Sequence, residues 1–161
     1  MSGPTLTDDE VTLARYADEL ARGVRARLGG WVIACIRRVA DEQDLAMDHV
    51  AAAHAAEAAE LCGAEIGARV EQLLASDIGE QTANPLQIVR DGVRYPTGVL
   101  RDLGAQPMVR DRFAVEAFPD DDFGLAPATF ADIDPSLHEP GLRWGAAKAH
   151  VHLRRRREGA T

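Results

Sequence analysis

The stretch that decides the fold runs from residue 51 to residue 74 and reads AAAHAAEAAELCGAEIGARVEQLL. Its apolar residues recur every three or four positions, as on one face of an α-helix; they are Ala51, Ala55, Ala58, Cys62, Ile66, Val70 and Leu73. Seven of the nine residues 51–59 are alanine. Because such small side chains let two helix backbones approach closely, we expect this helix to pack against a second long helix.

The preceding segment predicts that second helix. Thr7 and Glu10 have the spacing of a capping box, in which each side chain accepts a hydrogen bond from the backbone N–H of the other residue. One helical face continues behind them over about six turns; it consists of Leu13, Leu20, Val24, Leu28, Trp31 and Cys35. The pair Gly29-Gly30 predicts either a bend or a point of close packing. Residues 7–79 are expected to form an antiparallel helical hairpin that ends at Gly79.

Residues 84–118 predict a kinked helix followed by a short one. Asn84 and Pro85 are residue types favoured at a helix N-cap and first turn. Pro96 lies inside the run that follows, and because proline has no N–H it must kink this helix or split it in two. Pro107 is expected to open the short helix. The apolar positions of both helices are Leu86, Val89, Val93, Leu100, Leu103, Val109, Phe113 and Ala117.

The last part of the chain combines an acidic loop with a final helix. Residues 119–139 hold six acids and no lysine or arginine, which predicts a polar loop with brief helical turns after Pro127 and Pro135. Residues 140–158 predict a C-terminal helix. Its packing face is expected to consist of Leu142, Ala146, Ala149 and Leu153. These residues are four, three and four positions apart.

Composition agrees with one all-α domain. The chain has 161 residues, of which 46% are hydrophobic but only 5% aromatic, and alanine and leucine outnumber the β-branched residues, which favours helix over sheet. We therefore predict a single helical-bundle domain over residues 1–161. These values exclude a collagen, a disulfide scaffold and a disordered polymer. No apolar run approaches the roughly 20 residues of a membrane span.

Charge and cysteine usage indicate the compartment. The formal net charge of −8 disfavours non-specific binding of the whole chain to nucleic acid or to an anionic membrane. Cys35 and Cys62 lie in apolar helical segments and are expected to be free and buried. The first residues carry acids early and lack the apolar segment of a secretory signal. A cytoplasmic location is the expectation.

No catalytic residue, metal site or cofactor is expected. The sequence contains none of the nucleophile, phosphate-loop or di-iron motifs. His54 and Glu57, three residues apart on a helix, could form half of a metal site, and the carboxylates Asp120–Asp122 could hold a hard cation. Surface histidines and a solvated loop explain the same residues. A small metal- or ligand-binding enzyme that uses these groups is one alternative to a non-enzymatic protein.

The C-terminal helix carries the candidate partner-binding residues, which are Arg143, Trp144, Lys148, Arg154, Arg155, Arg156 and Arg157. Cations in the last helical turn complement the helix dipole, and we expect loose pairing between them and the acidic loop 119–139. If the two segments lie apart, the arginines form a patch for an acidic protein or for nucleic acid. No aromatic residue lies between the four arginines, which disfavours base stacking and makes nucleic acid the less expected partner.

Two places with locally unusual packing are candidates for a ligand groove or an interface. Tyr95 and Pro96 lie at the expected helix kink, and Trp144 is expected to be half exposed beside Arg143.

Four phrases of the sequence resemble segments of other proteins. They are Asn84-Pro85-Leu86, Val93-Arg94-Tyr95-Pro96, Pro119-Asp120-Asp121 and Trp144-Gly145-Ala146-Ala147-Lys148, and they resemble small actinobacterial helical proteins that have no assigned activity. The likeness covers most of residues 76–153. It implies no activity, cofactor or site residue.

The leading hypothesis is a non-enzymatic cytoplasmic helical-bundle protein that acts through protein–protein interaction. Long alanine-rich helices suit such contacts, and both a regulatory role and a homo-oligomer are compatible with them. The alternatives are the small enzyme described above and a nucleic-acid-associated factor that uses the arginine tail. No membrane partner is expected.

Overall fold

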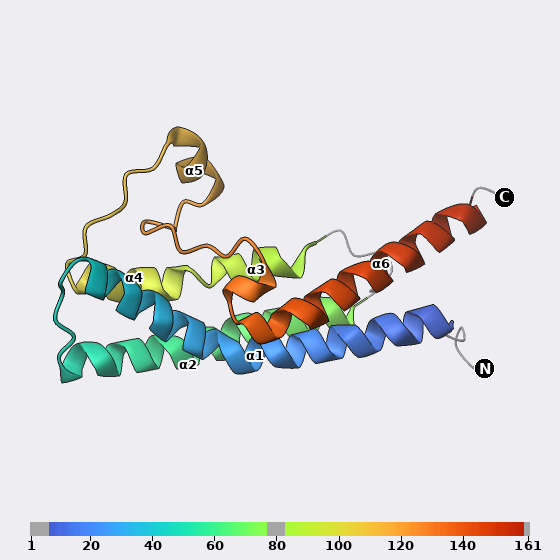
Figure 1. Ribbon diagram of the computed structural model, residues 1–161, viewed down its shortest axis with the longest axis horizontal. Helices are drawn as coiled ribbons and strands as arrows, with labels where there is room; N and C mark the ends of the chain where they lie inside the picture. Colours follow the sequence, from blue (N-terminus) through green and yellow to red (C-terminus); the bar gives the residue numbers. More distant parts are fainter. Residues whose placement is uncertain (1–6, 77–82, 160–161) are drawn as a thin grey trace.

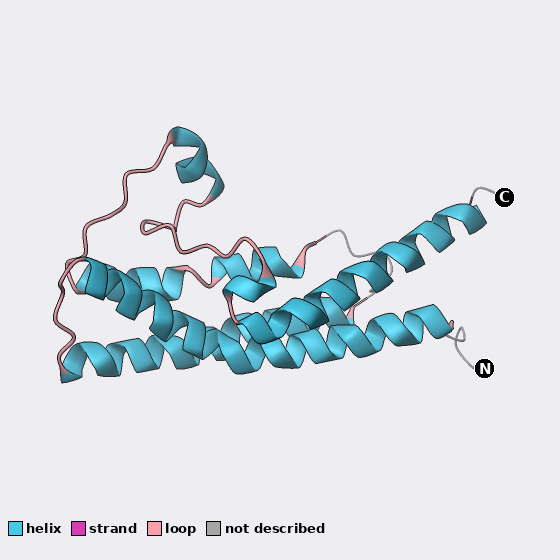
Figure 2. Ribbon diagram, in the orientation of Figure 1, coloured by secondary structure: helices cyan, strands magenta, loops and turns pink. Residues whose placement is uncertain are grey.

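Every regular element of the described residues is a helix. The computed structural model describes residues 7–76 and 83–159, and no strand occurs in these ranges (Figure 2). The elements are α1 (Asp8–Glu42), α2 (His49–Ala75), α3 (Pro85–Asp91), α4 (Arg94–Asp102), α5 (Arg112–Ala117), the 3-10 turns η2 (Phe130–Asp132) and η3 (Pro135–Leu137), and α6 (His138–Gly159). The predicted all-α bundle is confirmed. The helix end predicted at Gly79 lies outside the described residues.

The long helices α1 and α2 form the predicted antiparallel pair (Figure 1). The capping box at the start of α1 is complete, with Glu10 N to Thr7 Oγ1 at 3.3 Å and Thr7 N to Glu10 Oε2 at 3.1 Å. α1 continues unbroken through Gly29-Gly30. A Cβ atom on Gly29 would lie 3.4 Å from the carbonyl oxygen of Ala59, so this glycine marks a point of close packing against α2.

α3 and α4 pack on α2. The helix expected over residues 84–104, for which both a kink and a split at Pro96 were open, is split, and the break lies before the proline, at Gly92-Val93. α3 ends at Asp91 and α4 begins at Arg94. Pro96 lies in the first turn of α4. The backbone N–H groups of a first turn have no partner within the helix, so the N–H that proline lacks costs little there. The side chain of Asn84 caps α3 by accepting from Leu86 N at 2.9 Å. The predicted start of this region is therefore correct.

α6 lies along α1 with a different face from the one predicted. Trp144 and Val151 are buried, whereas the predicted packing residues Leu142, Ala146, Ala149 and Leu153 are exposed. At 100° per residue, these two sets lie on roughly opposite sides of the helix. The face prediction is wrong because α6 has two apolar stripes, and the one with the large indole side chain buries more apolar area.

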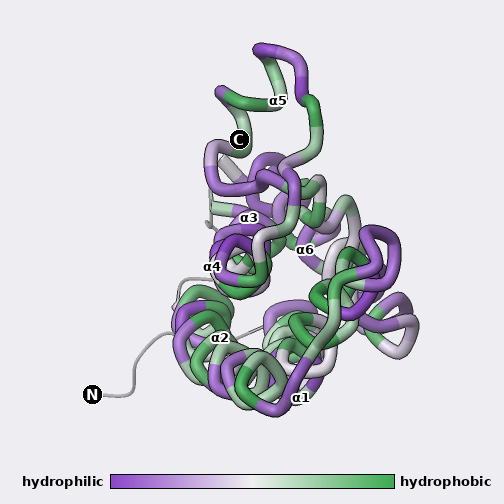
Figure 3. The backbone as a smooth tube through the Cα atoms, turned by 90° about the vertical axis from the view of Figure 1, so that its left-hand side faces the viewer, coloured by the Kyte–Doolittle hydropathy of each residue, from purple (hydrophilic) through white to green (hydrophobic). Residues whose placement is uncertain are grey.

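Residues 107–118, which we call the arm, stand away from the bundle (Figures 1 and 3). The helix in the arm begins at Arg112 rather than at the predicted Pro107, because Asp111 supplies the N-cap by accepting from Ala114 N at 2.7 Å. The residues just before it are extended, and the backbone N–H of Met108 donates to Asp122 O at 2.8 Å. α5 buries none of its residues, so the arm adds nothing to the core.

Candidate protein-binding surface

The arm is anchored firmly at its base. Gln43 at the end of α1 and Gln106 exchange two hydrogen bonds, of 3.0 and 2.8 Å. Arg110 Nη1 donates to Phe118 O at 2.5 Å, which joins the outgoing and returning segments of the arm. Arg101 Nε contacts Asp122 Oδ2 at 2.6 Å, and this ties the returning end to α4. The arm is therefore held at its base by contacts to two helices and across itself.

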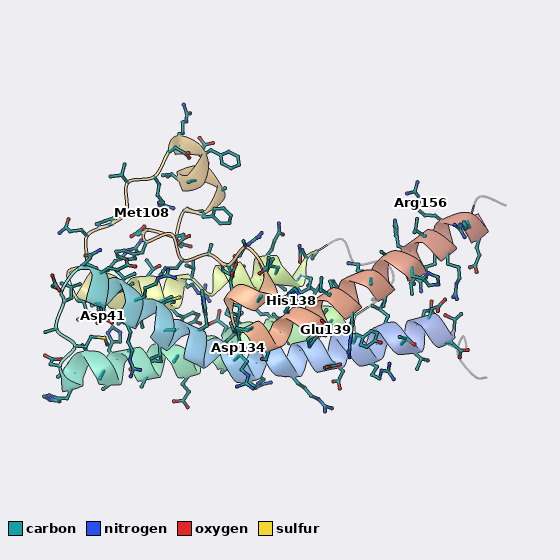
Figure 4. The ribbon with its side chains drawn as sticks, in the orientation of Figure 1. Asp41, Met108, Asp134, His138, Glu139 and Arg156 are labelled. Atoms are coloured by element: carbon teal, nitrogen blue, oxygen red, sulfur yellow. The ribbon has the colours of Figure 1, made fainter. Side chains whose placement is uncertain are left out.

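The outer part of the arm is apolar and exposed. Val109 is 98% exposed, Phe113 76% and Met108 58%, and Val115 is also exposed. Figure 4 places Met108 on the segment that leads out to α5. Single exposed apolar side chains scattered over a surface are normal in folded proteins. Several of them gathered on one projection are instead typical of a protein–protein contact. The arm is thus the strongest candidate site among the described residues.

Two of the three acids at the return of the arm, Asp121 and Asp122, are structural. Asp121 is buried, and its carboxylate accepts from Leu125 N at 2.5 Å and Ala126 N at 2.9 Å. Asp122 is bound by Arg101, whose hydrogen bond lowers the pKa of that carboxyl. The interpretation of Asp120–Asp122 as a fully solvated loop is wrong for these two residues, since both carboxylates are occupied by protein donors.

His54 and Glu57 lie on α2 beside a surface depression of about 420 Å³. His54 Nδ1 is 3.6 Å from Asp102 Oδ2. Within residues 7–76 and 83–159, no three His, Cys, Asp or Glu side chains are arranged to hold a metal ion.

Tyr95 lines the same depression, and Pro96 is buried next to it. The Tyr95 hydroxyl and the Arg94 guanidinium both donate to Glu65 of α2. These interactions lower the pKa of the Glu65 carboxyl, the Tyr95 hydrogen bond most. The predicted groove position thus contains a closed cluster of polar side chains between α4 and α2.

Two arginines of the tail face inward. Arg154 Nη1 lies 2.5 Å from Asp9 Oδ2, and Arg155 Nη2 lies 2.5 Å from Glu10 Oε1. Both acids belong to the first turn of α1. The expectation that these cations pair with loop 119–139 is wrong in its partner, because α6 runs antiparallel to α1 and brings its C-terminal turns to the start of that helix.

The remaining predicted residues of α6 divide between the two faces. Trp144 is 7% exposed, so the expectation of a half-exposed indole is wrong. Lys148 stacks over its ring at 5.0 Å, and burial lowers the pKa of this lysine. Arg156 and Arg157 are exposed, and Figure 4 shows Arg156 pointing away from α1. Arg143 is exposed as well and lies 3.8 Å from Glu139.

The arm as a site was not predicted from the sequence. Val109, Phe113 and Ala117 have helical spacing, and that spacing alone is typical of a packed face. One feature of the sequence argued against a packed helix: the short segment lies between two prolines, Pro107 and Pro119. Between two prolines there is room for only a short helix, which has few positions to pack against a bundle.

Comparison with protein-family models, curated proteins and solved structures finds no match to this chain. Fold and site together therefore define its class, which is an all-α bundle with a projecting apolar arm. None of the described helices combines the length and the apolar composition needed to span a membrane.

Proposed function

We propose that this chain is a non-enzymatic, cytoplasmic helical-bundle protein that acts by binding another protein through its arm. The observation that carries the proposal is the exposure of Val109 and Phe113 at the end of an anchored projection. Burying large apolar side chains of this kind against a partner removes apolar area from water, which favours association. Cys35 and Cys62 are free and buried, which agrees with a reducing compartment.

The anchoring of the arm supports a role in binding. A segment held in one conformation before it meets a partner loses little conformational entropy on association. The Gln43–Gln106 pair and the Arg101–Asp122 contact supply that restraint. A partner with an apolar pocket is the expected complement, and the experiment below tests a second copy of this chain as well as other proteins.

The experiment compares the wild type with Val109→Asp combined with Phe113→Asp. Val50→Asp is the matched control, since Val50 is an exposed valine at the start of α2, remote in sequence from the arm. Sedimentation velocity over a range of protein concentrations measures self-association. Quantitative mass spectrometry of proteins captured from native lysate measures binding of other proteins.

We expect an association that the arm variant loses and the Val50→Asp control keeps. All three proteins should give the same helical circular dichroism spectrum, because the substituted side chains are exposed. A wild-type protein that stays monomeric and captures nothing specific, or an association that survives the arm substitutions, would overturn the proposal.

A further inference from the structure

The side of α6 that faces away from α1 carries an apolar stripe that the bundle leaves exposed. Leu142 is 57% exposed and Leu153 54%, and Ala146 and Ala149 between them are also exposed. We call these four residues, together with Arg156 and Arg157 and with Arg143 at the edge, the outer α6 face. The Arg143 guanidinium lies 6.0 Å from the ring centre of Tyr16 in α1. The outer α6 face lies opposite the buried face of Trp144 and Val151. The stripe is therefore separate from the packing of the bundle.

The spacing of this stripe is that of a coiled-coil seam. Leu142, Ala146, Ala149 and Leu153 are four, three and four residues apart, which corresponds to heptad positions d, a, d and a. The stripe extends about 16 Å along the helix, or three turns. The two alanines in the middle let a second helix approach closely, and the leucines at either end provide apolar area to bury.

The charges beside the seam have one sign. Arg143 and Arg157 occupy e positions at the two ends of the seam, and no acid occurs from residue 140 to residue 157. Glu139, just before that range, lies 3.8 Å from Arg143, and His150, at the remaining e position, lies 3.3 Å from Asp9 of α1. Arg154 and Arg155 turn inward to α1. Arg156 and Arg157 are exposed and form no ion pair with a described residue.

These charges decide which partner fits. In a coiled coil, residues at e and g positions of one helix face those of the other and set partner choice. If a second copy used the same face, arginines would meet arginines, which disfavours pairing. A helix with glutamate or aspartate beside its apolar seam would instead meet a cation at each end.

We infer that the outer α6 face binds an amphipathic helix of a partner protein, with leucine-type side chains in its seam and acids on its flanks. This binding surface is distinct from the arm. The inference therefore does not depend on the function proposed above.

Two synthetic three-heptad peptides test the inference. Both carry leucine at a and d; one carries glutamate and the other lysine at e and g. Fluorescence anisotropy with the full chain should show binding of the glutamate peptide, weakening with salt. The lysine peptide should bind at least about tenfold more weakly, because like charges would face each other.

Variants separate a seam from simple charge attraction. Leu142→Ser with Leu153→Ser should weaken the glutamate peptide about tenfold or more, through loss of buried apolar area. The arm variant Val109→Asp with Phe113→Asp should bind this peptide as the wild type does. Both substituted proteins should keep the wild-type melting temperature, because all four side chains are exposed.

Three results would overturn the inference. One is that the glutamate and lysine peptides bind equally well, or that neither of them binds. Another is binding of the glutamate peptide that the two leucine substitutions leave unchanged. The third is tighter binding of a labelled thymidine oligonucleotide than of the glutamate peptide, abolished by Arg156→Gln with Arg157→Gln, which would identify the face as a nucleic-acid site.

Discussion

Arg155 of α6 donates a 2.5 Å hydrogen bond to the Glu10 carboxylate of α1, and this contact joins the C-terminal turns of one helix to the first turn of the other. The second oxygen of Glu10 accepts from Thr7 N at 3.1 Å and completes the helix cap. One carboxylate thus serves both the start of α1 and the docking of α6. The inward arginines join α6 to α1, and the outward Arg156 and Arg157 are exposed.

Arg155→Gln is expected to lower the melting temperature near neutral pH. Between neutral pH and acid, the melting temperature of this variant should fall by less than that of the wild type. The hydrogen bond from Arg155 lowers the pKa of Glu10 below its ordinary value of 4.5 in the folded chain. Stability from such a group is present above the unfolded pKa and is lost as the pH falls through 4.5 toward the lowered folded value. Melting curves from neutral pH to below 4.5 measure both effects. Arg157→Gln should follow the wild type, and identical behaviour of the two variants would contradict the prediction.

Val151→Ala is expected to lower the free energy of unfolding by about 1–3 kcal/mol, because it removes two methyl groups from a fully buried site between α6 and α1. Leu153→Ala, on the exposed side of the same helix, should change it by less than about 0.5 kcal/mol. Urea denaturation measures both values. A larger loss for Leu153→Ala would mean that α6 packs through its other face.

Gly67→Ala is expected to destabilise the α1–α2 contact by about 1–2 kcal/mol. A Cβ atom there would lie 2.8 Å from Cγ and 3.1 Å from Cβ of Arg25, closer than side chains normally pack. Gly30→Ala is the control, since a Cβ on Gly30 meets nothing within 4 Å. It should stabilise the chain by about 0.5–1 kcal/mol, because alanine favours the helix. Equal effects of the two substitutions in urea denaturation would show that Gly67 is not a contact point.

Both cysteines are expected to resist alkylation while the chain is folded. Burial raises the pKa of Cys35 and of Cys62 to about 12, so little reactive thiolate forms near neutral pH. Iodoacetamide should modify both residues rapidly in denaturant and leave the native chain unmodified over the same time. Mass spectrometry counts the adducts. Fast modification of either cysteine in the native protein would contradict the burial described here.

Most of the helices could be predicted because their signals are local. The capping box at Thr7 and Glu10 and the Asn84-Pro85 start depend on residues within one turn of each other, and the structure confirms both. The alanine-rich segment 51–59 predicted a close helix contact for a steric reason that holds wherever the partner lies. The arm was not predicted, because the spacing of Val109 and Phe113 is the same in a packed helix and in an exposed one.

The outer α6 face could be predicted only in part. The tail arginines were identified as a group, but their division between inward Arg155 and outward Arg156 depends on the rotation of α6 about its axis. That rotation follows from the choice between the two apolar stripes of α6. Each stripe has the correct helical period, so periodicity could not distinguish them.

The sequence by itself determined the helical class, the starts of α1 and α3 and the pairing of the first two helices. These features depend on caps, propensity and side-chain size, which act within a few residues. Only the tertiary structure decided that Trp144 lies inside and Leu153 outside, and that Arg155 binds Glu10 rather than the acidic loop. Such contacts join segments far apart in the chain, and their partners are set by how the whole bundle buries the most apolar area and satisfies its charges.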